Sequence, residues 1–294
     1  MTPLLSVILP TRNRANLLPA ALRSLEVAAE ACSQVEIIVI DNGSTDETPA
    51  IIDAWAKGGT QRVVLKVAEP GQSRAINAGF AAAQAPVLAL TDDDIVVTPH
   101  WLRCIVDFFA AHPEYSAAMG PVRVPREVTD PALIQRIAWY GTLPFFDAGE
   151  QVRDLDEMYG CNMLLRRTAV DQVGGFNERL GPGTSGFGGD TDMSFRIRRA
   201  GLRIGYIPDA VIYHAVEGSR LTPEFFRRYH HQKARSVFLM DAGLTRQNNL
   251  GRCIEAAFGY VWARLTRNLR RQLRAEAKLI RHIEFWRLNR RGYG

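Results

Sequence analysis

The stretch LALTDDDIVVTPHWL, residues 88–102, decides the fold class of this 294-residue chain. The apolar residues at its beginning belong to a run, residues 86–92, that predicts a buried strand. Residues 99–112, which follow later in the chain, predict a helix. Between the two stand Asp92, Asp93 and Asp94. Three adjacent carboxylates repel one another and are costly to bury unpaired. They therefore lie either in a solvated turn or helix cap, or against a positive charge.

The same alternation of strand and helix extends back to the start of the chain. Near-continuous apolar runs predict strands at 4–11, 35–43, 62–69 and 86–92, and helical spacing of apolar residues predicts helices at 13–31, 45–57, 73–85 and 99–112. Buried strands separated by helices are typical of a mostly parallel sheet covered on both faces. The predicted fold class is therefore α/β.

Polar clusters follow three of these strands, at residues 11–13, 41–44 and 92–94. Ligands of such sheets bind beyond the carboxyl ends of the strands, so we expect the three clusters to share one rim. Asp92 and Asp94, two residues apart on an extended turn, can point to the same side. Their hard oxygen atoms suit Mg²⁺ or Mn²⁺, which takes one or two carboxylates together with phosphate oxygens.

The second half of the chain is less regular. A strand turning into a short helix is predicted at 158–176, a glycine-rich loop at 177–192, a helix at 193–201 and a strand at 202–216 that ends near His214. From about Thr222 the sequence is helical and basic. Residues 251–294 hold eleven Lys or Arg and three acidic residues, so a basic tail follows a mildly acidic body.

Composition excludes several classes of protein. The four cysteines form no CxxC pair, which argues against a disulfide scaffold and a structural zinc site and favours a reducing compartment. The first residues do not read as a signal peptide, and no run reaches the ~18 apolar residues of a membrane span. We expect a cytoplasmic protein, with peripheral association at the inner face of a membrane.

Five motifs in order carry a resemblance to a known family: SVILPTRNR (6–14), EIIVIDNGSTDET (36–48), GQSRAINAGF (71–80), LALTDDDIVVTPHWL (88–102) and GGDTDMSFRIRRAGLRIGYIPDAVIYH (188–214). Together they resemble the family 2 glycosyltransferases. The resemblance implies the GT-A fold, with a catalytic domain at 1–221 and a basic helical extension at 222–294. Residues 1–98 would form its nucleotide-binding half and 99–221 its acceptor-binding half.

The family's donor is a nucleotide-diphosphate sugar of the UDP, GDP or dTDP type, whose sugar is transferred with inversion to an acceptor hydroxyl. The resemblance places Pro10, Thr11, Arg12, Asp41, Arg74, Asp92 and Asp93 at the nucleotide-sugar. It makes Asp92 and Asp94 a DXD motif that binds Mn²⁺ or Mg²⁺, with His214 as a further ligand. For Asp41 the alternative is a turn carboxylate, and for His214 a structural histidine.

The resemblance also implies the catalytic base and the acceptor pocket. Asp190 matches the expected base, although Gly189 stands where a Glu is common, so one neighbouring acid is missing. Asp192 is the rival base, with capping of the following helix as its alternative role. Asn162 and Trp139 are expected at the acceptor. Arg74 lies two residues before the position where the family often carries an arginine, which weakens its assignment.

From Tyr260 the apolar residues fall near helical spacing with arginines between them, which predicts a basic amphipathic helix. It would lie on an anionic membrane surface, as suits a lipid-linked acceptor in surface polysaccharide or glycolipid assembly, or pack on the catalytic domain. Nucleic acid is not expected, since no binding motif accompanies the charge. The competing functions are a catalytically silent sugar-nucleotide binder and a sugar nucleotidyltransferase; the latter needs a glycine-rich loop after the first strand, which is absent here.

Overall fold

The computed structural model describes residues 2–59, 61–240, 250–266 and 268–290. Its contacts group the chain into two compact units. Unit 1 comprises residues 1–125, 145–178 and 189–215, and unit 2 comprises residues 126–144, 179–188 and 216–294. The predicted boundary between 221 and 222 remains a prediction.

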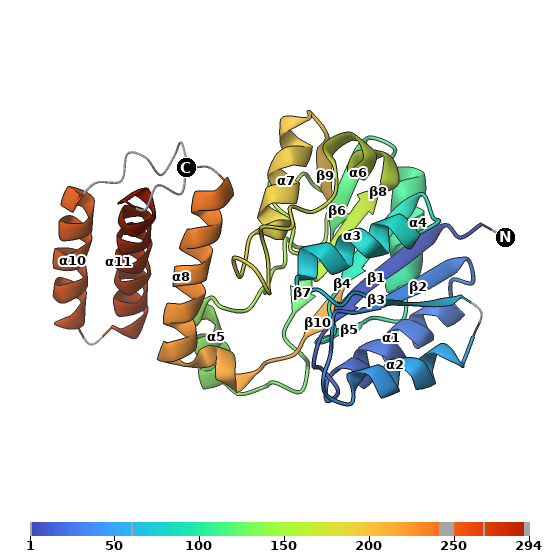
Figure 1. Cartoon of the computed structure of the whole chain (residues 1–294), viewed down its shortest axis with the longest axis horizontal. Coiled ribbons are helices and arrows are strands. Elements are labelled where there is room, and N and C mark those ends of the chain that lie inside the picture. Colours follow the sequence, from blue (N-terminus) through green and yellow to red (C-terminus); the bar gives the residue numbers. More distant parts are fainter. Residues whose placement is uncertain (1, 60, 241–249, 267, 291–294) are drawn as a thin grey trace. The chain divides into compact units, whose positions relative to one another are not determined.

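Unit 1 is built on a seven-stranded sheet (Figure 1). In spatial order its strands are β3 (Arg62–Lys66), β2 (Val35–Asp41), β1 (Leu5–Thr11), β4 (Val87–Thr91), β8 (Asn162–Arg166), β6 (Tyr115–Met119) and β9 (Arg203–Tyr206). All neighbouring pairs are parallel except those that β8 makes with β4 and β6. A smaller sheet has the order β5 (Ile95–Val97), β10 (Ile212–His214), β7 (Val122–Arg123).

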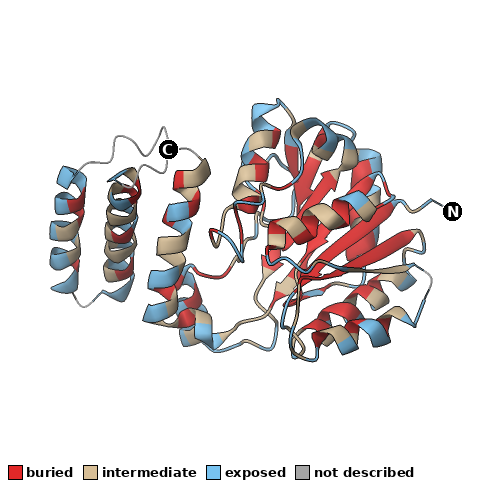
Figure 2. Cartoon of the chain, viewed as in Figure 1, coloured by how far each residue is buried: buried red, intermediate tan, exposed pale blue. Residues whose placement is uncertain are grey.

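Helices cover both faces of the large sheet (Figure 2). Alternate residues of β1 point to opposite faces, so Val7 packs in one core with α1 (Leu18–Glu30), α2 (Thr48–Ala56) and α4 (Trp101–Ala111). Ile8 packs in a second core with α3 (Gln72–Ala82), α6 (Arg167–Val173) and α7 (Gly189–Arg199). The predicted α/β sheet covered on both faces is confirmed.

Three predictions about the elements need correction. The strand expected at 202–216 is two strands in different sheets, β9 and β10, because the turn around Pro208 separates them. Strands β5, β6 and β7 were not predicted. The helix expected from 193 begins at Gly189, which puts Asp190 and Asp192 in its first turn.

Unit 2 is helical. It contains α5 (Pro131–Tyr140), a short 3₁₀ helix (Gly218–Leu221), α8 (Pro223–Met240), α10 (Leu250–Arg264) and α11 (Leu269–Arg290). Helix α11 packs against both α8 and α10. The single basic helix expected from Tyr260 is thus two helices; Arg267 and residues 291–294 of the basic tail lie outside the described residues. No helix in the described part of the chain is long and apolar enough to cross a membrane.

Candidate active site at the carboxyl ends of the strands

The ends of β1 and β2 form one wall of the site. Thr11 and Asp41 are register partners at the last positions of these strands, and both are buried. The carboxylate of Asp41 accepts a hydrogen bond from the Ser44 N–H at 2.9 Å, as the alternative role in a turn requires. Pro10 is buried within β1, whereas Arg12 is exposed just beyond it. The predicted shared rim is therefore present for these two strands.

Asn13 joins the loops that follow β1 and β2. It adopts a left-handed conformation (φ 53°), which Asn tolerates better than most residues. Its N–H donates to Ser44 Oγ at 3.0 Å, and its Oδ1 accepts from the Thr45 N–H at 2.7 Å. The Arg14 N–H donates to Thr48 Oγ1 at 2.9 Å. These hydrogen bonds fix the loops after β1 and β2 relative to each other. This role of Asn13 was not predicted, although a short polar side chain in the motif SVILPTRNR is suited to it.

The acidic triplet is partly neutralised by the protein itself. Asp92 is half-buried and accepts from Gln72 Nε2 at 3.2 Å. Asp93 is buried with Arg14 Nε at 3.4 Å. Burial and the neighbouring Asp94 raise the pKa of Asp93 to about 6, while Arg14 acts in the opposite direction. A positive charge at the triplet, one of the two possibilities from the sequence, is present in Arg14.

Asp94 lies against His214. Both side chains are buried, and Nε2 of His214 is 3.4 Å from Asp94 Oδ1. His214 Nδ1 is 2.8 Å from the carbonyl oxygen of Ala215, which can only accept, so Nδ1 carries a proton and Nε2 is the nitrogen directed at the carboxylate. Among the described residues, no group of three or more His, Cys, Asp or Glu side chains is arranged to hold a metal ion. One imidazole and one carboxylate nevertheless fit a divalent cation that takes its other ligands from phosphate and water.

Asp190 lies in the first turn of α7 and is half-buried. Its Oδ1 accepts from the Thr191 N–H at 2.9 Å and its Oδ2 from the Gly160 N–H at 3.3 Å. Burial raises the pKa of Asp190, the charge of Glu157 adds to the rise, and the two N–H groups oppose it. A carboxylate with a raised pKa that keeps some exposed surface has the properties of a general base.

Glu157 was not predicted as a site residue. Its Oε1 accepts from Thr191 Oγ1 at 2.5 Å, which holds its charge beside Asp190. A Cβ atom on Gly189 would lie 3.1 Å from Phe176 Cδ1 and 3.3 Å from Ser73 Oγ, so a glutamate is tightly hindered there. The neighbouring carboxylate that is absent from position 189 thus comes from residue 157. No local spacing in the sequence links the two positions.

Asp192, the rival base, is engaged elsewhere. It pairs with Arg196 at 2.8 Å, one helical turn later. Arg196 also donates to the carbonyl oxygens of Val173, Gly174 and Gly175 behind α6. The observed contacts of Asp192 are therefore those of a residue that positions Arg196.

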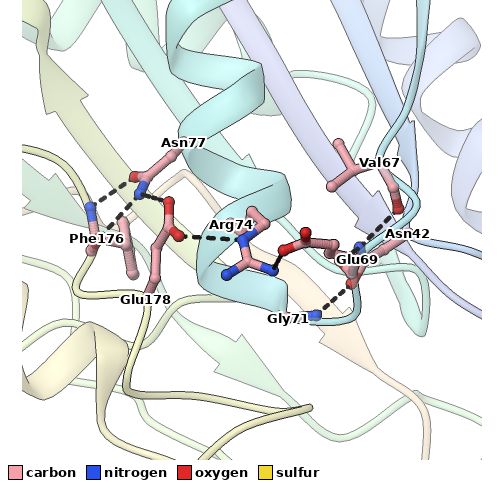
Figure 3. A network of polar contacts seen from close by, with 8 residues as sticks. All are labelled: Asn42, Val67, Glu69, Gly71, Arg74, Asn77, Phe176 and Glu178. Atoms are coloured by element: carbon pink, nitrogen blue, oxygen red, sulfur yellow. Dashed lines mark hydrogen bonds and ion pairs between the residues drawn. The ribbon is translucent and has the colours of Figure 1, made fainter.

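Arg74 belongs to a polar network on α3 (Figure 3). Its guanidinium pairs with Glu69 and, at 3.1 Å, with Glu178. In the same network Asn77 binds both backbone groups of Phe176, accepting at 2.7 Å and donating at 2.9 Å. The contact of Arg74 with a diphosphate remains a prediction. It requires the guanidinium either to break its ion pairs with Glu69 and Glu178 or to bind the diphosphate while keeping them.

The two predicted acceptor residues lie in different surroundings. Asn162 has no exposed surface; it accepts from Trp101 Nε1 at 3.0 Å and donates to the carbonyl oxygens of Pro121 and Ala210 at 3.2 and 2.9 Å. Its side chain therefore offers no exposed group to an acceptor. Trp139 lies on α5 in unit 2. Its role at the acceptor remains a prediction.

Two observations place Asp190 near the triplet. Asn162 is the register partner of Thr91, directly before the triplet, and Gly160, which binds Asp190, lies two residues before Asn162. Between them the buried thiol of Cys161 has its pKa raised by burial and then by the charges of Asp92, Asp94 and Asp190. The charges of Asp92, Asp94 and Asp190 therefore all act on one buried thiol of unit 1.

Residues 6–174, more than half of the chain, match the sequence profile described as glycosyl transferase family 2. The chain belongs to this family. The Sinorhizobium fredii protein y4gI is 30% identical to this glycosyltransferase-family chain over 78% of this chain's length. The β-monoglucosyldiacylglycerol synthase of Synechocystis is 27% identical over 58% of this chain's length. The matched regions span only 26% and 35% of those two proteins.

Solved structures confirm the fold of this family 2 chain. The mannosyltransferase PcManGT from Pyrobaculum calidifontis, described in complex with GDP-Man and Mn²⁺, superposes with a TM-score of 0.63 at 20% identity. The match covers 96% of this chain and 86% of PcManGT. Together with the mainly parallel sheet, it confirms the predicted GT-A fold.

Proposed function

We propose that this chain transfers a sugar from a nucleotide-diphosphate sugar to an acceptor hydroxyl with inversion, and that Asp190 is the general base. The observation that carries the proposal is that Asp190 is half-buried with a raised pKa, and that its charge and those of Asp92 and Asp94 act on the same buried thiol, Cys161. Inversion needs a carboxylate on the far side of the sugar from the leaving diphosphate, as in inverting glycoside hydrolysis. A positioned base of this kind contributes typically ~10²–10⁴-fold to the rate.

The donor in this proposal lies against the wall made by the ends of β1 and β2. Pro10, Thr11 and Arg12 line the nucleotide, and Asp41 accepts a hydrogen bond from its base or ribose through the oxygen that Ser44 does not use. Asp92 and Asp93 contact the nucleotide-sugar. The complex of PcManGT with GDP-Man supports a donor of this class, of the UDP, GDP or dTDP type.

Asp94 and His214, with Asp92 beside them, are the residues that would hold Mn²⁺ or Mg²⁺. When bound, such a cation neutralises charge on the leaving diphosphate. His214 is kept in one orientation by the carbonyl of Ala215, so its Nε2 stays directed toward Asp94 without a conformational search.

We further propose a lipid-linked or membrane-associated acceptor, as in surface polysaccharide or glycolipid assembly. The name of the Synechocystis relative, a diacylglycerol glycolipid synthase, supports this acceptor class. Trp139 would offer an aromatic face to an acceptor sugar.

The decisive experiment compares Asp190→Asn with Asp192→Asn, two isosteric changes in the same helical turn. For Asp190→Asn we expect turnover to fall at least ~100-fold while nucleotide affinity is kept, because only the proton acceptor is removed. Asp192→Asn weakens a pairing with Arg196 and should retain most of the activity. Equal activity of the two variants would refute Asp190 as the base.

A thermal-shift panel of nucleotide diphosphates and their sugars, with and without Mn²⁺, identifies the donor. Ligand binding to the native state raises the melting temperature, so the true nucleotide should give a metal-dependent shift. Asp94→Asn and His214→Gln should each reduce the metal-dependent part. A catalytically silent binder would show the same shifts but no turnover with any donor in wild-type protein.

A further inference from the structure

Helix α10 carries a stripe of exposed apolar side chains. Ile254, Phe258, Val261 and Trp262 of this helix, and Leu265 directly after its last residue, are between 50% and 77% exposed. Their spacing of three and four residues places them on one side of the helix. Exposed aromatic and aliphatic residues in a continuous row mark an interaction surface more often than single exposed ones do.

The opposite side of α10 is used for folding. Cys253, Ala256 and Ala263 are buried, and α10 packs against α11. Cys253 Sγ lies 3.3 Å from the carbonyl oxygen of His282, and Glu255 is 3.7 Å from Lys278 of α11. Among the described residues, the exposed stripe therefore lies on the side of α10 that does not pack on α11, and a partner would account for it.

Helices α10 and α11 together are strongly positive. The described residues of α10 and α11 include nine Lys or Arg and three Glu. Exposed basic residues recur along α11 at Arg270, Arg274, Lys278 and Arg281. Each of the three glutamates already contacts a basic side chain: Glu255 with Lys278, Glu276 with Arg227 and Glu284 with His231.

We propose that the exposed stripe of α10 docks on an anionic lipid bilayer. Phe258, Trp262 and Leu265 enter the boundary between headgroups and acyl chains, and the arginines of α11 bind lipid phosphates. An apolar face on a pair of helices with net positive charge is a combination that favours binding in the plane of an anionic interface. The choice of lipid over a second copy of this chain follows from the charge, since two such basic surfaces repel each other.

The test is co-sedimentation of the full chain with vesicles of phosphatidylcholine alone and of phosphatidylcholine with 40% phosphatidylglycerol. We expect binding to the anionic vesicles only, with release at high salt because the charges are exposed. The double variant Phe258→Ser, Trp262→Ser should bind anionic vesicles at least ~10-fold less. The double variant Arg270→Gln, Arg274→Gln should bind them less and with a weaker salt dependence.

Phe195→Ser is the matched control, because Phe195 is an equally exposed aromatic (60%) on α7 in unit 1. It should leave vesicle binding unchanged, and all variants should keep the wild-type melting temperature. The inference is overturned if wild-type chain ignores anionic vesicles, or if the Phe258/Trp262 variant binds as well as wild type. It is also overturned if wild type forms a dimer that this variant abolishes while neither binds lipid. These results do not depend on turnover, so they separate this inference from the proposed reaction.

Discussion

Asn162→Ala is expected to destabilise the chain and weaken donor binding, although Asn162 has no exposed surface. Its amide joins three elements around the start of the acidic triplet: Trp101 of α4, Pro121 before β7 and Ala210 before β10. Asn162 itself is the register partner of Thr91. Removing the amide therefore weakens the contacts that hold the end of β4, directly before Asp92, in place.

The cost can be counted group by group. Without Asn162, the buried indole N–H of Trp101 loses its hydrogen-bond acceptor and the Ala210 carbonyl loses a donor, whereas the Pro121 carbonyl keeps its bond from the Ile212 N–H at 3.0 Å. Each buried group left unsatisfied costs about 1–3 kcal/mol. The total is about 2–6 kcal/mol before any cavity, equivalent to a melting temperature lower by roughly 2–4 °C per kcal/mol.

Thermal and denaturant unfolding of Asn162→Ala would measure this cost, with nucleotide-diphosphate binding followed in parallel. Gln84→Ala is the matched control, since it removes an exposed amide two residues beyond the end of α3 and should change stability by less than about 0.5 kcal/mol. If Asn162→Ala unfolds within about 1 kcal/mol of the control, the triad of buried hydrogen bonds does not support the rim as argued.

Three other perturbations test separate parts of the structure. Gly120→Ala should destabilise by about 3 kcal/mol or more in denaturant unfolding, because its Cβ would lie 2.0 Å from the backbone oxygen of Ala210; a loss below about 1 kcal/mol would contradict this close approach. Glu157→Gln keeps an acceptor for Thr191 but removes the charge that raises the pKa of Asp190, so the acid limb of the kcat/KM profile should move to lower pH; an unmoved limb would separate Glu157 from the base. Burial and nearby cations lower the pKa of His230 to about 4, below its unfolded value, so unfolding free energy should fall as pH drops from about 6.5 toward 4. His230→Gln should flatten that dependence in acid titrations of unfolding, and an unchanged slope would assign it to other groups.

Much of the sheet could be predicted because its strands are buried on both faces. Residues 35–43 and 86–92 read as strands from their unbroken apolar runs, and the polar residues behind them mark the carboxyl ends. The short strands β5 and β7 could not be predicted, because they have no long apolar run. β5 and β7 have three and two residues, and their pairing with β10 comes from distant segments rather than from local pattern.

The same distinction applies to the site. Residues that belong to a motif, such as Asp94, His214 and Asp190, could be named in advance, because the family resemblance orders them along the chain. The partners that tune them could not. Arg14 at Asp93, Glu157 beside Asp190 and the pair of carboxylates on Arg74 all depend on which loops the fold brings together.

The three acids that opened the sequence have three different partners. Asp92 receives a neutral amide, Asp93 a guanidinium and Asp94 an imidazole. Because a neutral imidazole has a lone pair to offer and a guanidinium does not, the His214–Asp94 pair is the one of the three that can supply two electron-pair donors to a cation. In this arrangement Arg14 permanently offsets the repulsion within the triplet, and Asp94 and His214 are the pair that would bind a cation. Mn²⁺ should therefore raise donor affinity in the wild-type chain, and the His214→Gln variant should lose that difference.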